Sequence, residues 1–160
     1  MDAITLLKND HKEVKALFKE VEALGERANA GRQKLFRQID LALTAHAQIE
    51  EKIFYPQFKA RAEDDEETQE ALEAYVEHSL IKGLIAELEA MAPTDESYRA
   101  KLQVLSEIVD HHAKEEEKEM FKMARDLFDT EELRELGDEM AAAKQKFLAQ
   151  AKAKKPQKAA

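Results

Sequence analysis

The sequence predicts an all-α protein, an up-down-up-down four-helix bundle followed by a short fifth helix. The composition excludes most sheet architectures, because the 160 residues include four Gly, three Pro and no Trp, while Ala, Glu, Lys and Leu abound. Apolar residues recur at intervals of three and four, as they do in helices that pack at small angles. Breaks in that pattern divide the chain into segments of helix length. A chain of this size fits one domain.

The predicted helices follow one another with short connections. We expect them at residues 2–28, 32–62, 66–91, 96–128 and 130–152, with breaks at Asn29–Gly31, Glu63–Asp65 and Pro93–Asp95. Pro56 should bend the second helix without ending it, because Phe58 continues the apolar pattern. Asp129 or Thr130 is expected to cap the last helix, and Asp129 would form a capping box with Glu132.

The domain organisation follows from these segments. We expect a bundle domain at residues 1–128, a C-terminal helix at 129–152 and a disordered basic tail at 153–160. A net charge of −9 argues against nucleic acid or an anionic membrane as a partner. The N-terminal sequence has neither a signal-peptide core nor a membrane span, so we expect a cytoplasmic protein, either a monomer or a weak homo-oligomer.

The apolar stripes of the four long helices are each interrupted by histidine. They run Ile4, Leu7, His11, Val14 and Phe18; Phe36, Ile39, Leu43, His46, Glu50 and Ile53; Ala71, Ala74, His78, Ile81 and Ile85; and Leu102, Leu105, Val109, His112 and Glu116. A single core histidine is usually an ordinary hydrogen-bonded residue. Four of them on four stripes require another explanation.

An internal duplication provides that explanation. The segment HKEVKALFKEVEAL from His11 aligns with HSLIKGLIAELEAM from His78, and HAQIEEKIFY from His46 aligns with HAKEEEKEMF from His112. Each copy is a helical hairpin with a His on its first helix and His-x-x-x-Glu on its second. At a rise of about 1.5 Å per residue, counting from the loops places all four His in one layer of the core.

This layer predicts a metal site without sulfur ligands, because the chain has no cysteine. Two buried carboxylates without compensating charge would cost several kcal/mol each. Four imidazoles and two carboxylates suit iron or manganese better than calcium, magnesium or structural zinc. We expect two ions, each held by two His, bridged by carboxylates and by an oxo or hydroxo group. The predicted ligands are His11, His46, Glu50, His78, His112 and Glu116.

Several neighbouring residues leave alternatives open. Glu117, which recurs in the duplication as Glu51 does, is the alternative to Glu116 as a ligand. His111 lies off the stripe and is expected at the surface or outside the ligand set. A further group of polar residues could orient ligands or protons, although ordinary packing or surface roles are expected for them: Lys8, Asp10, Tyr55 and Tyr75.

Residues 2–125 resemble the hemerythrin-like, HHE cation-binding family. The resemblance rests on NDH around His11, HAQIEEKIFYP from His46, VEH at His78 and HHAKEEE around His112. It implies a hemerythrin-like four-helix bundle with a non-haem di-iron centre, and the set of four His and two Glu is similar to proteins that repair damaged iron centres. Oxygen-carrying members have a fifth His one turn beyond the third-helix His, where this chain has Lys82.

Three functions remain open on the sequence. The first is a di-iron protein that binds or senses a small ligand such as dioxygen or nitric oxide, or that handles iron. The second is a di-iron oxidoreductase that reduces peroxide or nitric oxide or repairs iron centres. The third is an interaction module in which the metal is structural. The sequence offers no separate substrate pocket or acid–base set to favour the enzyme.

Overall fold

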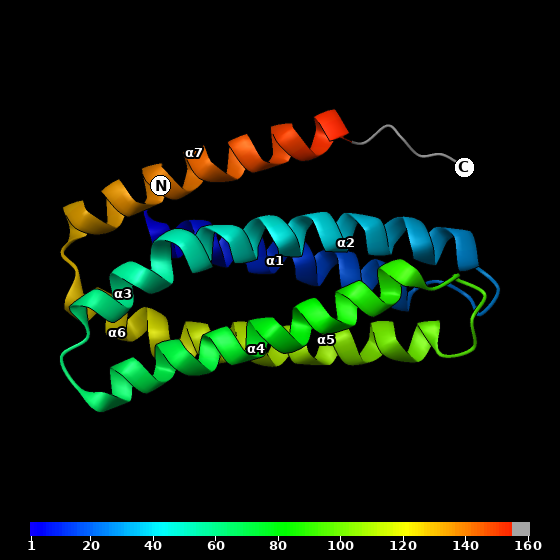
Figure 1. Cartoon of the computed structure of the whole chain (residues 1–160), viewed down its shortest axis with the longest axis horizontal. Coiled ribbons are helices and arrows are strands. Elements are labelled where there is room, and N and C mark those ends of the chain that lie inside the picture. Colours follow the sequence, from blue (N-terminus) through cyan, green and yellow to red (C-terminus); the bar gives the residue numbers. More distant parts are fainter. Residues whose placement is uncertain (155–160) are drawn as a thin grey trace.

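The computed structural model describes residues 1–154, and that part of the chain is helical with no strand. Four antiparallel rods form the predicted up-down-up-down bundle (Figure 1). In chain order the helices are α1 (Ala3–Glu22), α2 (Asn29–Ile49), α3 (Tyr55–Arg61), α4 (Asp65–Ala90), α5 (Tyr98–Glu115), α6 (Phe121–Leu127) and α7 (Thr130–Lys154). The all-α fold class is therefore confirmed.

The first and third rods are α1 and α4. The second rod (α2 and α3) and the fourth rod (α5 and α6) each contain a turn of π-helix. Glu50–Phe54 (η1) joins α2 to α3, and Glu116–Met120 (η2) joins α5 to α6. In each turn a backbone N–H donates to the carbonyl five residues earlier, from Tyr55 to Glu50 and from Phe121 to Glu116. Pro56 follows the first turn without ending the rod, as predicted. No proline accompanies the second turn, so proline is not the shared cause of the two widened turns.

The first connection differs from the prediction. Helix α1 ends at Glu22, and Asn29–Gly31 form the first turn of α2 where a break was expected. The reason is the buried side chain of Arg32, which donates a hydrogen bond of 2.7 Å to the carbonyl of Gly25. This contact fastens the loop upstream of Asn29, where the apolar pattern alone indicated helix. The other helix boundaries lie within a few residues of their predicted positions.

The predicted capping box at the start of the last helix is confirmed. The Asp129 carboxylate accepts from the Glu132 N–H at 2.8 Å, and the Glu132 carboxylate accepts from the Asp129 N–H at 2.9 Å. Helix α7 then runs to Lys154, beyond its predicted end at residue 152. The predicted disordered basic tail, 153–160, thus begins inside α7, and its residues 155–160 lie outside the described residues.

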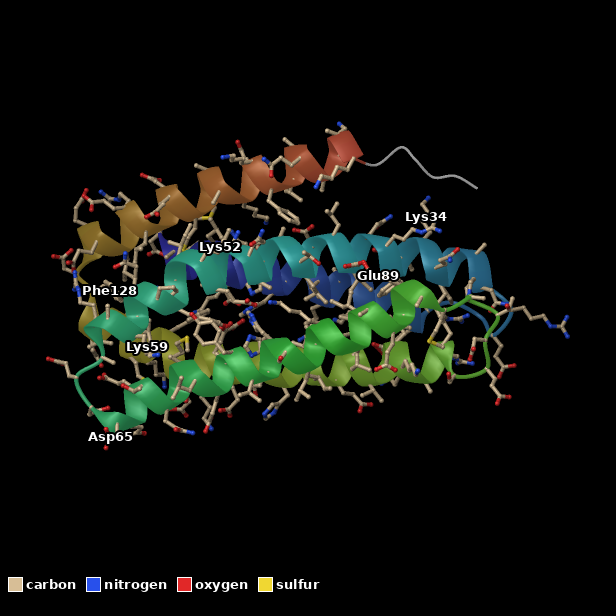
Figure 2. All side chains as sticks on the ribbon, in the orientation of Figure 1. Lys34, Lys52, Lys59, Asp65, Glu89 and Phe128 are labelled. Atoms are coloured by element: carbon tan, nitrogen blue, oxygen red, sulfur yellow. The ribbon has the colours of Figure 1, made fainter. Side chains whose placement is uncertain are left out.

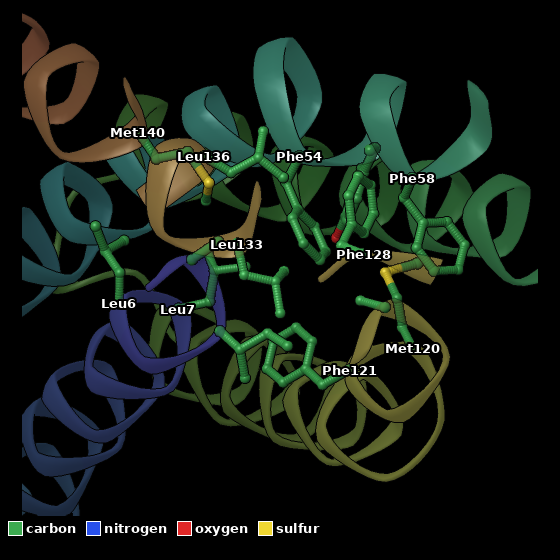
Figure 3. Close-up of a cluster of buried hydrophobic side chains, with 14 of the residues drawn as sticks. Leu6, Leu7, Phe54, Phe58, Met120, Phe121, Phe128, Leu133, Leu136 and Met140 are labelled. Atoms are coloured by element: carbon green, nitrogen blue, oxygen red, sulfur yellow. The ribbon is translucent and has the colours of Figure 1, made fainter. Parts of the chain in front are cut away.

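The apolar core has two parts, one towards each end of the bundle. The first part joins the bundle to α7 and includes the aromatic rings of Phe54, Phe58, Phe121 and Phe128 (Figure 3). The second part fills the end where α1 turns into α2 and α4 into α5, and includes Phe36 and Tyr98 among its buried residues. The predicted histidines lie between these two apolar clusters along their helices, as His11 does between Leu7 and Val14 and His46 between Leu43 and Ile49.

Helix α7 packs across the start of the bundle, beside α1 and α2 (Figure 1). Leu133, Leu136 and Met140 are buried there. Gly137 faces the backbone at residues 1–3 so closely that a Cβ would stand 2.2 Å from the carbonyl oxygen of Met1. None of the helices up to residue 154 is long and apolar enough to cross a membrane.

One acidic pair outside the predicted site makes stability depend on pH. Burial, together with the neighbouring Glu89 carboxylate, raises the pKa of Asp40 from 3.8 to about 7, although Thr44 donates a hydrogen bond to it. Asp40 lies on α2, and Glu89 lies on the facing part of α4 (Figure 2). The folded protein therefore binds a proton at Asp40 more tightly than the unfolded chain does. This favourable contribution is complete below about pH 4.

Stability should accordingly fall as the pH rises from about 4 to about 7, by less than about 1.4 kcal/mol per pH unit because solvent screens a partly exposed pair. Asp40→Asn should make this slope shallower, because among the described carboxylates only Glu70 then keeps a pKa raised to about 7. The variant should match the parent near pH 4 and exceed it in stability near pH 8. Urea unfolding across that range measures the effect. Glu20→Gln, which removes an exposed carboxylate on α1, is the control, and an unchanged slope in Asp40→Asn would contradict the expectation.

Candidate metal centre

Four rods bring the six predicted ligand residues together between the two apolar clusters. Helix α1 provides His11, α4 provides His78, and the second and fourth rods provide His46 with Glu50 and His112 with Glu116. Five of the six are buried, at 5% exposure or less, and His11 is nearly so. All six side chains that the duplication singled out therefore converge in space.

The histidines form one pair per hairpin. The ring centroids of His11 and His46 are 5.0 Å apart, and those of His78 and His112 are 4.8 Å apart. The Nε2 atoms of His78 and His112 face each other at 3.1 Å. Potential ligand atoms group in the same way, with His11, His46, Glu50 and Glu116 in one set and His78, His112 and Glu50 in the other.

The two carboxylates span both pairs. Glu50 Oε1 lies 3.1 Å from His46 Nε2 and 3.0 Å from His78 Nε2. Glu116 lies 3.1 Å from His11 Nε2 through Oε1 and 3.5 Å from His112 Nε2 through Oε2. Each carboxylate thus approaches one histidine of each hairpin, which is the position that a bridging ligand needs.

A second carboxylate holds the outer nitrogen of every histidine. The Nδ1 atoms of His11, His46, His78 and His112 lie 2.7, 2.9, 2.7 and 2.6 Å from Glu117, Asp10, Glu51 and Glu77, respectively. A carboxylate accepts the Nδ1 proton, so each ring presents the lone pair of Nε2 to the centre. Histidine ligands of protein-bound metals are oriented in this way.

The duplication explains this outer set. Asp10 and Glu77 immediately precede the histidines of α1 and α4, and each reaches across its hairpin to the partner's histidine, His46 or His112. The other two, Glu51 and Glu117, immediately follow the central glutamates. Each contacts a histidine of the opposite hairpin, His78 and His11 respectively. The outer contacts therefore repeat with the pseudo-twofold symmetry of the hairpins.

The alternative ligand Glu117 lies outside the centre. It is 40% exposed and its carboxylate holds His11 Nδ1, whereas Glu116 is 2% exposed and faces the Nε2 atoms. Of these two, Glu116 is the one placed to act as a ligand. His111 is exposed and its Nε2 is 3.8 Å from Glu77, in keeping with the expectation of a role outside the ligand set.

Two residues expected to have ordinary roles belong to the site. Asp10 holds His46 and also accepts a hydrogen bond from Lys144 of α7. The hydroxyl of Tyr55, which is fully buried, donates to the carboxylates of Glu50 and Glu116 and lies 3.1 Å from His78 Nε2. Their positions in the sequence could have indicated this role. Asp10 immediately precedes the predicted ligand His11, and Tyr55 follows the predicted ligand Glu50 by five residues.

The electrostatics of the centre favour positive charge. Burial alone would lower the pKa of His46, but the charge of Glu50 and the hydrogen bond to Asp10 outweigh it and raise that pKa to about 10. Burial would also lower the pKa of His112, but the charge of Glu116 and further carboxylate contacts outweigh it and raise that pKa well above its usual value. Burial would raise the pKa of Glu50, yet the charge of His46 and the surrounding imidazole hydrogen bonds lower it well below its usual value.

The donor set fits divalent or trivalent metal ions. His46 Nε2 and Glu50 Oε2 are completely buried and have no hydrogen-bond partner among the described residues, because the close approach of His46 to Glu50 Oε1 lacks hydrogen-bond geometry. Unpartnered buried polar atoms are costly unless something else satisfies them. A cation between these atoms would satisfy both and balance the carboxylate charge.

Comparisons with known proteins agree with this arrangement. Residues 2–124 match the family model described as "Hemerythrin HHE cation binding domain". An uncharacterized protein, Rv2633c, of Mycobacterium tuberculosis is 28% identical over 143 residues, which cover 89% of this chain and 84% of that protein. A Nostoc protein named "DNA nickase" is 30% identical over 147 residues, covering 92% of this chain. The chain spans 40% of the length of that Nostoc protein.

A solved structure shares the fold. The crystal structure of a Hemerythrin HHE cation binding domain-containing protein, the Rv2633c homolog from Mycobacterium kansasii, superposes with a TM-score of 0.82 at 24% identity. The superposition covers 96% of this chain and 91% of that one, so the likeness extends over α7 as well as the bundle.

Proposed function

Because this chain belongs to the hemerythrin HHE cation-binding domain family, we propose that its cluster of His and Glu binds two iron ions as a non-haem centre. The ligands are His11, His46, Glu50, His78, His112 and Glu116, and manganese is the alternative metal. The proposed role is to bind or sense a small diatomic ligand such as dioxygen or nitric oxide, or to handle iron.

One observation carries the proposal: every imidazole of the cluster is fixed at Nδ1 by a carboxylate, which leaves four Nε2 lone pairs around two buried carboxylates. Two Nε2 atoms without protons cannot hydrogen-bond to each other, yet those of His78 and His112 face each other at 3.1 Å. A polar core with a purely structural role does not require this arrangement. Two ions, each held by one hairpin's histidines, would engage all four of these nitrogens.

Apolar side chains exclude bulk water from one side of the cluster. Phe54, Met120 and Phe121 are at most 2% exposed, and the ring of Phe121 stacks on that of His11 with centroids 5.9 Å apart. When bound, iron would supply Lewis acidity and redox capacity among buried side chains, where electrostatic interactions are strong. The protein's part is to position the nitrogens and to neutralise charge.

Tyr55 favours the second candidate, a di-iron oxidoreductase. Its phenol donates to both central carboxylates, so it can hold or deliver a proton at the place where a bound small molecule would react. We expect Tyr55→Phe to retain its metal and to lower any turnover of peroxide or nitric oxide by roughly a hundredfold, the usual scale for a lost proton donor. Tyr75→Phe is the matched control. Equal turnover in both variants would remove Tyr55 from the reaction.

The proposal is tested by purifying the protein from iron-supplemented cells, counting metals per chain by mass spectrometry and recording the visible spectrum in air and after reduction. About two irons per chain, lost in His46→Ala and in His112→Ala, are expected. A well-folded protein without iron or manganese would leave a structural or interaction role. Steady-state turnover with a reductant then separates the oxidoreductase from a binding protein or sensor.

The outer carboxylates should tune metal affinity without being ligands. Glu77→Ala removes the group that holds His112 Nδ1 at 2.6 Å, and we expect metal affinity to fall about 10–100-fold, the usual cost of losing such a partner. Competition with a chelator measures the affinity. Glu73→Ala, an exposed site one turn earlier on α4, is the control, and an equally small effect in both variants would contradict the expectation.

A further inference from the structure

A groove between α1 and α5 opens beside the cluster. It encloses about 670 Å³, within the range of small-molecule sites, and its inner end is formed by His11, His46 and His112. The floor is apolar and consists of Val14, Phe18, Leu43, Ile81 and Val109. A molecule much larger than a diatomic gas therefore fits against this side of the bundle.

The pseudo-twofold symmetry of the hairpins provides an internal comparison. The equivalent groove lies between α2 and α4 and encloses only about 200 Å³. There Lys82 of α4 donates to Glu51 at 2.6 Å, so the two sides of that groove are tied together and its lysine is neutralised. The duplication aligns Lys82 with Lys15 and Glu51 with Glu117.

The corresponding tie is missing from the larger groove. Lys15 makes no ion pair with Glu117 or with any other carboxylate in residues 1–154, although the alignment puts the same two residue types at the same places. Glu117 instead contacts only His11 among ion-pair partners. The groove between α2 and α4 is therefore bridged by the ion pair of Lys82 with Glu51, whereas the groove between α1 and α5 has no such bridge and Lys15 remains unpaired among the described residues.

More lysines of α1 stand along the same groove. Lys8, Lys12 and Lys19 also line it, and none has an ion-pair partner within the described part of the chain. The lining carboxylate Asp110 is paired with Lys114 at 2.8 Å, which leaves Glu22 and Glu107 as the unpaired acids of the lining. The whole lining holds as many carboxylates as lysines, but on a protein of net charge −9 it places four lysines without ion pairs in residues 1–154, all on α1, beside an apolar floor.

We propose that the groove between α1 and α5 binds an amphiphilic organic anion, a carboxylic acid with an unbranched apolar chain. The acid group contacts Lys12 and Lys15 at the rim, and the chain lies on Phe18 and Val109 towards the histidines. The lysines give charge complementarity, and the floor removes the chain from water. Three metal ligands form the inner end of the groove, but the acid group is placed at the lysines of the rim, so binding does not require iron in the cluster.

Isothermal titration of dodecanoate, at concentrations below those at which it forms micelles, tests the proposal on metal-loaded and metal-depleted protein alike. We expect one molecule to bind per chain in both forms. Dodecyltrimethylammonium, which has the same chain and the opposite charge, should bind about tenfold more weakly or not at all. Absence of dodecanoate binding, or equal binding of the cation, would overturn the proposal.

Two variants locate the site. Lys12→Glu combined with Lys15→Glu should weaken dodecanoate binding about tenfold or more, whereas Lys34→Glu combined with Lys59→Glu, which changes net charge equally at exposed positions elsewhere, should not. Ser106→Trp fills the groove from α5 and should abolish binding; Gln103→Trp, on an exposed part of the same helix, should not. Circular dichroism confirms that each variant is folded.

Failure of the organic-anion proposal can be distinguished from failure of the metal proposal. Binding seen only in metal-loaded protein would mean that the carboxylate coordinates the ion, and it would overturn the placement of the acid group at the lysines. Binding that survives both Ser106→Trp and the Lys12/Lys15 double variant would place the molecule elsewhere and would also overturn the proposal. The second comparison can be made on metal-depleted protein, so its outcome does not depend on whether the cluster binds iron.

Discussion

Glu50→Gln is expected to abolish tight metal binding while the bundle stays folded. Glu50 is completely buried and its Oε1 lies within 3.1 Å of one histidine from each hairpin, so a single change affects both halves of the cluster. The amide keeps the volume and removes the charge that balances two cations. Loss of a buried charged partner typically costs about 3–5 kcal/mol, which corresponds to roughly 10²–10⁴-fold in affinity.

Metal content after purification and chelator competition measure this loss, and thermal unfolding without metal shows whether the fold survives. Glu51→Gln, which changes the neighbouring outer carboxylate, should show a milder loss of about 10–100-fold. Glu66→Gln, at the exposed start of α4, should show none. A Glu50→Gln protein with the full metal content would sink the proposal that Glu50 bridges two ions.

Gly137→Ala should have the largest effect on stability among the glycine-to-alanine substitutions. The added Cβ would stand 2.2 Å from the carbonyl oxygen of Met1 and 2.8 Å from the backbone nitrogen of Ala3. These are backbone atoms that no rotamer change can move, so α7 must shift away from the start of α1. Overpacking of this kind costs about 1–3 kcal/mol, although alanine otherwise favours a helix.

Gly83→Ala is the matched control, because no atom outside its own helix lies within 4 Å of the added Cβ. That variant should gain about 0.5–1 kcal/mol from the lower flexibility of its unfolded chain. Urea unfolding followed by circular dichroism measures both. Opposite signs are expected, and a stabilised Gly137→Ala would contradict the close packing of α7 against residues 1–3.

The placement of the cluster could be predicted because its signal is repeated. A lone His-x-x-x-Glu carries little information, but His46 with Glu50 and His112 with Glu116 stand on matching apolar stripes, and the stripes determine which faces meet in the core. Glu116 and Glu117 could not be separated in this way, since one residue along a helix is a rotation of about 100° and both positions recur. Burial in the folded chain separates them.

Other features depend on contacts that no local pattern encodes. The end of α1 at Glu22 depends on Arg32 reaching back over the loop to Gly25. The π-helical turns leave the apolar stripe nearly intact, so the spacing alone predicts a regular helix through Glu50 and Glu116. Asp10 looked like a surface residue because its partner Lys144 is 134 residues away in sequence.

That last contact makes α7 more than a cover for the apolar core. Lys144 donates to Asp10, and Asp10 holds His46, so the docked helix and the basicity of one imidazole depend on each other. Thermodynamic linkage is reciprocal: whatever free energy the docked helix adds to occupancy of the cluster, occupancy returns to docking. A partner that pulls α7 away from the bundle and an ion that binds at His46 would therefore oppose each other.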